Sequence, residues 1–449
     1  MSKPLLPHQI EDGQFLADRN FSGNFSGMGS GKTLTALEAF RHVKSLVTDQ
    51  VIIIGPPISL HMWASEFEAY FPDDTAQVVK TGKTKIDGAA TAIVMSYDIA
   101  RAKIDELKAL GARALICDES HALKNPEGKT AASIVGPGGL ASFVDHAWML
   151  TGTPTTRWND DLYTFLLRAD PQGMKVRVGG TSLSRFRMKY CVMQAKKFSA
   201  RQRYPTMVTV GNRNTAELND WIFGEGLAVR RELKDVWAAM PPLTINGLTI
   251  AMKMNPELSK ALKLFDKLST RELEEEVSKG GENLATIRRM IGQSKVPASA
   301  AEIADRVDSG AGAILVGAWH IDVIDDLVAN MKGRGLRCES LDGRTSAQDK
   351  QRLQDAFNEG DLDVLVGQIK AMGVSLNLQH GGNRIIVVEE DWSPSVMDQF
   401  YARLHRMGQQ DHVHVDVLRG ENKIEEAVAR ISNTKRAEHK RAMRQQEGK

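Results

Sequence analysis

The sequence has few cysteines and no long apolar segment. Its three cysteines, Cys117, Cys191 and Cys338, lie far apart and form no Cys-x-x-Cys pair. This spacing argues against a zinc site or a disulfide framework and fits a reducing compartment. No apolar run reaches the roughly 18 residues that a membrane span needs. The first residues, MSKPLLPHQIEDG, also lack the apolar region and the cleavage site of a signal peptide. We therefore expect a cytoplasmic protein with no membrane partner.

Acidic residues are missing from one long stretch, although the net charge of the whole chain is only +2. Residues 171–216 contain no Asp or Glu. An acid-free basic stretch in a near-neutral protein favours a local surface for a polyanion, and a solvated helical face is the alternative. The basic residues of this stretch are Lys175, Arg177, Arg185, Arg187, Lys189, Lys196, Lys197, Arg201, Arg203 and Arg213.

Short apolar runs occur in two groups along the 449 residues, a length that suits two to four domains. The runs are rich in β-branched residues and end at polar residues, Gly or Pro, which predicts buried strands of parallel sheets. Helical patterns, such as 322–331 and 347–358, lie between them. We therefore predict the α/β class with two separate α/β lobes. The runs are 51–54, 92–95 and 114–117 in the first half, and 313–316, 364–366 and 385–388 in the second.

A glycine-rich segment, Ser-Gly-Met-Gly-Ser-Gly-Lys-Thr at residues 26–33, precedes a helical pattern. Such a loop presents backbone N–H groups to phosphate oxygens. Lys32 would then reach the β- and γ-phosphates, and Thr33 would hold Mg²⁺. The strict pattern has Gly where this chain has Ser26. The predicted contacts to ATP come from Gly27, Met28, Gly29, Ser30, Gly31, Lys32 and Thr33.

Two carboxylates follow a predicted strand. Asp118 and Glu119 come directly after the run 114–117, which places them at the carboxyl edge of a parallel sheet, beside the phosphate loop. There Asp118 would help to hold Mg²⁺, and Glu119 would orient and deprotonate the attacking water. His121 is expected to contact the γ-phosphate side and the following motif, with a capping or packing role as the alternative.

A second basic cluster lies within residues 399–409. Arg403 and Arg406 are three residues apart, so on a helix they would share one face. They belong to the second predicted lobe, from which an arginine finger could supply charge to the γ-phosphate. Taken alone, an Arg-x-x-Arg pattern usually marks a surface helix.

Read in order, these segments resemble the motifs of superfamily-two helicases, and within them those of the Swi/Snf-like DNA translocases. The resemblance covers roughly residues 5–430 and departs from the family's pattern at Met372 and Ser375, where glycines are usual. In the first half the similar segments are 6–9 (the adenine-reading glutamine motif), 54–67 (motif Ia), 96–97 (Ib), 118–125 (II), 150–154 (III) and 230–236 (a basic block). In the second half they are 371–378 (V), 391–394 and 399–409 (VI).

The resemblance implies two RecA-like P-loop NTPase lobes with parallel sheets and small helical insertions, and ATP and Mg²⁺ as cofactors. It implies an ATP-dependent translocase or helicase on double-stranded DNA, with little sequence preference because phosphate contacts dominate. Gln9, His121 and Gln399 would contact ATP. The implied DNA contacts are Pro56, Ser59, Ser96, Tyr97, Lys124, Thr151, Thr153, Lys196, Lys197, Arg201, Arg203, Gly373 and Asn377.

Two alternatives stay open. One is a strand-separating DNA helicase or an RNA helicase of the same superfamily, and the other is a non-motor protein that uses ATP to switch a DNA clamp. We expect a minimal bacterial or phage member, with a nuclease or a replication or repair factor as a possible protein partner. The expected domains are 1–168 (first lobe), 169–240 (basic helical protrusion and end of the first lobe), 241–306 (linker and helical insertion), 307–431 (second lobe) and 432–449 (basic tail).

Overall fold

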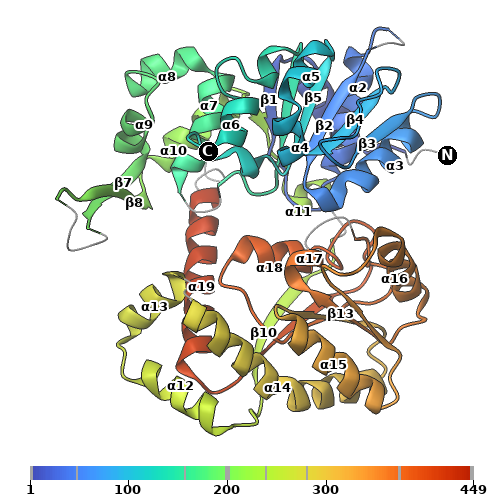
Figure 1. Cartoon of the computed structure of the whole chain (residues 1–449), viewed down its shortest axis with the longest axis vertical. Coiled ribbons are helices and arrows are strands. Elements are labelled where there is room, and N and C mark those ends of the chain that lie inside the picture. The colour runs from blue at the N-terminus through green and yellow to red at the C-terminus, as the bar shows by residue number, and fades with distance from the viewer. Residues whose placement is uncertain are drawn as a thin grey trace. The chain divides into compact units, whose positions relative to one another are not determined.

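The chain forms two compact units, Met1–Val236 and Trp237–Lys449, each built on a sheet of parallel strands (Figure 1). The structure, a computed structural model, describes residues 4–46, 49–155, 158–197, 203–237, 240–279, 282–372 and 376–444. The predicted α/β class with two parallel-sheet lobes is confirmed. In the described part of the chain, no helix is both long and apolar enough to cross a membrane.

The first unit has a seven-stranded sheet in the order β3-β4-β2-β5-β6-β1-β9, with parallel pairing throughout. The predicted strands at 51–54, 92–95 and 114–117 are confirmed as β2, β4 and β5, and each runs one residue further than expected. The strands are β1 (Phe21–Asn24), β2 (Val51–Gly55), β3 (Ala76–Val79), β4 (Ala92–Ser96), β5 (Ala114–Asp118), β6 (His146–Leu150) and β9 (Ala228–Val229).

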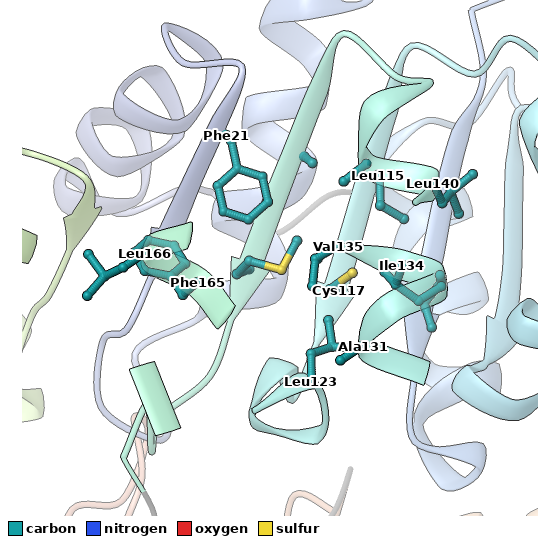
Figure 2. Packing of buried hydrophobic residues seen from close by; sticks show 14 of the residues in the cluster. Phe21, Leu115, Cys117, Leu123, Ala131, Ile134, Val135, Leu140, Phe165 and Leu166 are labelled. Carbon is teal, nitrogen blue, oxygen red and sulfur yellow. The ribbon is translucent and has the colours of Figure 1, made fainter. Parts of the chain in front are cut away.

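Helices cover both faces of this sheet, which is why its central strands are apolar at successive positions. Val51 and Ile53 pack with α1, α2 and α3 on one face. Ile52 and Ile54 pack on the other face, where Phe21, Cys117 and Ile134 belong to the same core (Figure 2). The helices are α1 (Pro7–Ala17), α2 (Lys32–Val43) and α3 (Leu60–Tyr70) on the first face, and α4 (Tyr97–Ala102), α5 (Ile104–Ala109), α6 (Lys129–Ile134) and α7 (Tyr163–Ala169) on the second.

The basic segment after this core is only partly helical. Helices α8 (Pro171–Val178) and α9 (Leu183–Tyr190) match the expected helical protrusion. The prediction is wrong for the residues that follow, because β7 (Cys191–Lys196) and β8 (Thr206–Asn212) form an antiparallel hairpin. The alternating β-branched residues Thr206, Val208 and Val210 favour a strand there. Helices α10 (Thr215–Asn219) and α11 (Leu233–Val236) lie on either side of β9 in the chain.

The second unit has a six-stranded sheet in the order β10-β15-β14-β11-β13-β12, again with parallel pairing. The second-half strands predicted at 313–316, 364–366 and 385–388 correspond to β11, β13 and β14. The strands are β10 (Leu243–Thr249), β11 (Ile314–Ala318), β12 (Cys338–Leu341), β13 (Val364–Gln368), β14 (Arg384–Val387) and β15 (Val413–Arg419).

Its helices form two layers and a separate bundle. The layer that contains α14 and α15 packs on one face of the sheet, and the layer that contains α16, α17 and α18 packs on the other. The bundle has its own apolar core. The layers are α14 (Glu282–Asp308) with α15 (Ile321–Gly333), and α16 (Ala347–Glu359) with α17 (Ile369–Met372) and α18 (Pro394–Tyr401). The bundle joins α12 (Pro256–Asp266) and α13 (Thr270–Lys279) to α19 (Lys423–Arg444).

Three expected boundaries differ from the structure. The expected linker from residue 241 contains β10, which pairs with β15 along seven residues and so belongs to the second sheet. The expected boundary at 306–307 falls inside α14, whose residues Ala300 and Ile303 pack on the sheet. The expected tail begins inside α19, because the apolar residues of that helix bury against α12 and α13.

Candidate functional site

The glycine-rich segment precedes a helix, α2, as predicted, and it connects this helix to β1. Gly29 and Gly31 have φ angles of 78° and 84°, a left-handed conformation that glycine adopts without strain. Gly31 is also the N-cap residue of α2, which begins at Lys32, so the first amides of the helix lie next to the loop. A helix start with free amides and a positive dipole end suits an anion.

Lys32 lies at the centre of this loop. Its Nζ donates hydrogen bonds to the carbonyl oxygens of Ser26 and Gly27, each at 2.9 Å. Burial lowers the pKa of Lys32, and the nearby carboxylates of Glu119 and Asp118 oppose that shift. A lysine that is folded onto its own loop can transfer its donors to phosphate oxygens when these enter.

Two residues of the predicted adenine-reading motif contact the same loop. The Gln9 side chain accepts a hydrogen bond from the Leu6 amide at 2.8 Å and donates to the Gly31 carbonyl at 3.5 Å. The His8 ring lies 3.0 Å from the Ser30 carbonyl oxygen. A Cβ atom on Gly31 would lie only 2.1 Å from the Gln9 amide nitrogen, so this glycine is also needed for the close approach of α1.

Ser26, the departure from the strict loop pattern, has a specific partner. Its buried hydroxyl accepts a hydrogen bond from the Arg231 amide at 3.0 Å, and the Gly27 amide donates to the Arg231 carbonyl at 2.8 Å. The Arg231 guanidinium in turn pairs with Asp12 at 2.8 Å and with Glu11 at 3.0 Å. A glycine at position 26 would remove the acceptor of the Arg231 amide.

The two predicted catalytic carboxylates end β5, beside the loop. Asp118 Oδ2 accepts the indole N–H of Trp63 at 2.8 Å, and its Oδ1 accepts the Glu119 amide at 3.0 Å. Burial, together with the neighbouring charge of Glu119, raises the pKa of Asp118 to about 6, against the opposing effects of Trp63 and Lys32. An acid with a raised pKa at a sheet edge is a common feature of functional sites.

Glu119 has a left-handed backbone, with φ of 49°. Non-glycine residues rarely adopt this conformation, and such strain concentrates at active sites. His121 Nδ1 lies 3.1 Å from Glu119 Oε2 and 3.2 Å from Thr151 Oγ1. The contact of His121 with the following motif is therefore present as expected.

The Thr-Gly-Thr segment at residues 151–153 also approaches the phosphate loop. A Cβ atom on Gly152 would lie 3.0 Å from Met28 Cγ and 3.6 Å from Lys32 Nζ. Three segments that are distant in sequence, around Lys32, Asp118 and Gly152, therefore meet at one edge of the sheet. Backbone amides, the Thr33 hydroxyl and the Asp118 carboxylate form a donor set that fits a Mg²⁺-bound nucleoside triphosphate.

Several residues expected to contact DNA use their side chains inside the unit. The Tyr97 hydroxyl donates to the Asp118 carbonyl at 2.8 Å, and the Ser59 hydroxyl donates to the Pro56 carbonyl at 3.0 Å. Ser96 caps α4 by accepting the Ile99 amide. Ser59, Ser96, Thr151 and Thr153 are all buried. In this conformation these buried side chains support the sheet edge. They expose too little surface to contact DNA.

The remaining predicted DNA residues are distributed over both units. Lys124, Pro56 and Asn377 are partly buried, whereas Lys196, Lys197 and Arg203 are exposed on the β7–β8 hairpin. Arg201 and Gly373 lie outside the described residues. The assignment of all these residues to DNA stays a prediction.

The two arginines of the second unit lie close together, but not on a helix. Helix α18 ends at Tyr401, so the prediction of a shared helical face is wrong and both residues lie in the turn that follows. Arg403 Nη1 and Arg406 Nη1 donate to the same acceptor, the Leu376 carbonyl, at 3.3 and 3.1 Å. Arg403 Nε also donates to the carbonyl of Gln399 at 3.0 Å.

Sequence reasoning did not include Trp63 and Arg231 among the site residues. Both lie in segments that the family resemblance had marked, but their partners are distant in sequence. Trp63 contacts Asp118, 55 residues away, and Arg231 contacts Ser26, 205 residues away. The described residues hold no cluster of three or more His, Cys, Asp or Glu suited to a metal ion, so a metal here would depend on phosphate oxygens as well as on protein.

Comparison with known proteins identifies the family. Residues 24–253 match the SNF2-related domain, and residues 300–408 match the helicase conserved C-terminal domain. The chain is 27% identical over 429 residues to a SWI/SNF-related matrix-associated actin-dependent regulator of chromatin subfamily A-like protein 1 homolog of Caenorhabditis elegans, covering 92% of the chain and 58% of that protein.

Two further matches span most of the chain. An uncharacterized ATP-dependent helicase of Mycoplasma genitalium is 24% identical, over 94% of this chain and 40% of that protein. The Sulfolobus solfataricus SWI2/SNF2 ATPase core in complex with dsDNA aligns at a TM-score of 0.44 and 19% identity, over 94% of this chain and 88% of that one. The chain thus spans 40% to 58% of the length of these two curated relatives. Since the SNF2-related domain alone matches more than half of its residues, the chain belongs to the SNF2-related family.

Proposed function

We propose that this chain is a DNA-dependent ATPase that hydrolyses ATP to ADP and phosphate in order to move along or remodel double-stranded DNA. The proposal depends chiefly on one arrangement, in which Lys32 and the Asp118–Glu119 pair meet at one sheet edge. A lysine for phosphate and adjacent carboxylates for metal and water are the parts that phosphoryl transfer to water needs. The family and the name of the Mycoplasma relative, an ATP-dependent helicase, support the same reading.

Each residue has a role in the proposed reaction. The loop amides and Lys32 hold the phosphates, and Thr33 and Asp118 would hold Mg²⁺, which neutralises charge on the phosphate oxygens. Glu119 accepts the proton of the attacking water as its oxygen bonds to the γ-phosphorus, and the bond from that phosphorus to ADP breaks. His121 positions the Glu119 carboxylate at 3.1 Å. Arg403 and Arg406 are proposed to stabilise charge on the transferred phosphoryl group.

Duplex DNA is the proposed track, and phosphates are its main recognised feature. Phosphate contacts carry affinity without sequence information, which suits exposed cations such as Lys196, Lys197 and Arg203. We further propose a minimal member of the family that acts in a bacterial cytoplasm, where a nuclease or a repair factor would be a suitable protein partner.

ATP hydrolysis with different nucleic acids tests the proposal. We expect a duplex of about 40 base pairs, long enough for several turns of the helix, to stimulate turnover more than a single strand or an RNA duplex of equal length and concentration. Greater stimulation by single strands or by RNA would instead favour a strand-separating or an RNA helicase. ATP binding without turnover under any of these conditions would favour the clamp and overturn the motor.

A further inference from the structure

The β7–β8 hairpin extends from the α/β core of the first unit, beyond α9 and α10 (Figure 1). Strand β7 pairs with β8 from Cys191, opposite Asn212, to Lys196, opposite Thr206. The register shifts between Val192 and Met193. In its outer half, Gln194, Ala195 and Lys196 on β7 and Thr206 and Met207 on β8 are all exposed. A two-stranded ribbon without cover on either face is marginally stable in water, so this half is suited to contact a partner.

The inner half of the hairpin is anchored to the unit. Thr209 Oγ1 donates to Asp160 at 3.1 Å, and the Asn159 amide donates to the Asn212 side chain at 2.7 Å. Arg213 Nε donates to the Cys191 carbonyl at 2.8 Å. A ribbon that is fixed at its base and bare further out can present its outer residues without a large loss of conformational freedom.

The basic residues of this region divide into the same two halves. At the base, Arg187 pairs with Asp160 at 2.7 Å, and Lys189 pairs with Glu217 at 2.5 Å. Further out, Lys196 ends β7, Lys197 follows it, and Arg203 lies shortly before β8. These three cations have no acidic partner within ion-pair distance among the residues that the structure describes. Acids from outside the stretch therefore offset part of the positive charge at its base, whereas no ion pair offsets the charge of the three outer cations in the described part of the chain.

Apolar side chains accompany these outer cations. Tyr204 is 70% exposed and Met207 is 54% exposed. The guanidinium of Arg203 lies 5.4 Å from the centre of the Tyr204 ring. The outer hairpin thus combines positive charge with exposed apolar and aromatic surface, whereas a surface for phosphates alone needs only the charge.

We propose that the outer half of this hairpin lies in a groove of duplex DNA, with Lys196, Lys197 and Arg203 on phosphates and Tyr204 and Met207 against base edges. The proposal rests on the proposed function and adds a contact surface of a different kind. A two-stranded ribbon fits the major groove, whose thymine methyl groups accept apolar contacts. The cations then neutralise the phosphates that border the groove.

The two kinds of contact have different salt dependence, which gives the test. A charge variant, K196Q/K197Q/R203Q, should reduce the slope of log K against log salt by roughly 0.9 for each phosphate that the protein no longer neutralises. An apolar variant, Y204A/M207A, should weaken duplex binding by roughly tenfold with no change in slope, because no counterion is released at these side chains. The conservative variant Y204F should bind like the parent, since it keeps the ring.

A matched charge control is available on and just after α12. The variant K260Q/K263Q/K267Q also removes three positive charges, from lysines that lie far from the hairpin in sequence, and it should leave both affinity and slope unchanged. Thermal unfolding of each variant checks that it folds, and duplex and single-stranded probes of equal length are compared. The proposal is overturned if neither hairpin variant binds the duplex differently from the parent, or if binding weakens only on single strands. Failure of the proposed function is separate, because it would appear as a parent protein that duplex DNA does not stimulate.

Discussion

The indole N–H of Trp63 donates a 2.8 Å hydrogen bond to Asp118 Oδ2, and Trp63 is completely buried. This bond joins α3 to the carboxylate at the end of β5. It favours the charged form of Asp118 and so opposes the burial that raises the pKa of this acid. Trp63 is therefore a positioning residue, because it acts on the reaction only through Asp118.

Replacing Trp63 with Phe tests this role. The ring volume is largely kept, but the donor to Asp118 is lost, and a hydrogen bond to a charged group contributes roughly 1.5–3 kcal/mol. We expect the Mg²⁺ concentration for half-maximal ATP hydrolysis to rise by roughly tenfold, and the acid limb of the pH profile to move to higher pH. Trp148→Phe is the matched control, since the buried Trp148 loses only a bond to the Leu16 carbonyl. An equal Mg²⁺ requirement in Trp63→Phe and the parent would contradict the positioning role.

Replacing Asp118 with Asn should change how stability depends on pH. The folded-state pKa of about 6 lies above the ordinary value of 3.8, so the folded protein binds this proton more tightly than the unfolded chain. In the absence of metal, the stability linked to Asp118 is present below the ordinary pKa and is lost as the pH rises through about 6. Because asparagine does not ionise, the Asp118→Asn variant does not lose this stability as the pH rises.

Thermal unfolding in EDTA measures this difference. We expect the melting temperature of Asp118→Asn, relative to the parent, to be higher at about pH 8 than at about pH 4.5, on either side of the folded-state pKa. Asp105→Asn, at an exposed position of α5, should show no such trend. A difference from the parent that stays constant with pH would mean that the Asp118 pKa is close to its ordinary value.

Glu119→Gln should separate ATP binding from hydrolysis. The amide can still accept a hydrogen bond but cannot take a proton, and general-base catalysis typically contributes about 10²–10⁴-fold. We expect nucleotide affinity close to that of the parent and turnover lower by about that factor. Lys32→Ala should weaken nucleotide binding as well. Glu127→Gln, a few residues further along the chain, serves as the control, and hydrolysis by Glu119→Gln at the parent rate would show that another group is the base.

Arg403→Ala and Arg406→Ala test the proposed arginine finger. In related phosphoryl-transfer enzymes such a residue contributes about 10³–10⁵ in rate, so we expect a strong loss of DNA-stimulated turnover in at least one variant. Because both side chains donate to the Leu376 carbonyl, unfolding curves must be recorded alongside. Arg334→Ala, exposed after α15, is the control. Near-parental turnover in both variants would exclude the finger.

Prediction from sequence was most successful where the physical signal is local. Apolar runs such as 51–54 predict buried strands because parallel sheets are covered on both faces. The phosphate loop was also predictable, since its glycines meet a conformational need at closely spaced positions. The sequence predicts that Arg403 and Arg406 lie close together because they share a helical face. In the structure they lie close together because both donate to the Leu376 carbonyl.

The parts that were missed depend on contacts between distant segments. Strand β10 has polar residues or glycine at four of its seven positions and pairs with β15, about 170 residues later, so no local pattern predicts it. The sequence predicts a helical protrusion that includes the hairpin, because the β-branched alternation that favours a strand is confined to β8. The internal use of Tyr97 and Ser59 depends on which way each side chain turns, which a motif match does not specify.

Arg231 has a consequence for how the first unit ends. Its amide and carbonyl are both hydrogen bonded to the phosphate loop, at Ser26 and Gly27, and it lies shortly before the end of the unit at Val236. The amide and carbonyl of Arg231 therefore hold the main chain against the phosphate loop shortly before the first unit ends. A displacement of Ser26 and Gly27 would therefore act directly on the main chain of Arg231, shortly before the chain continues to Trp237.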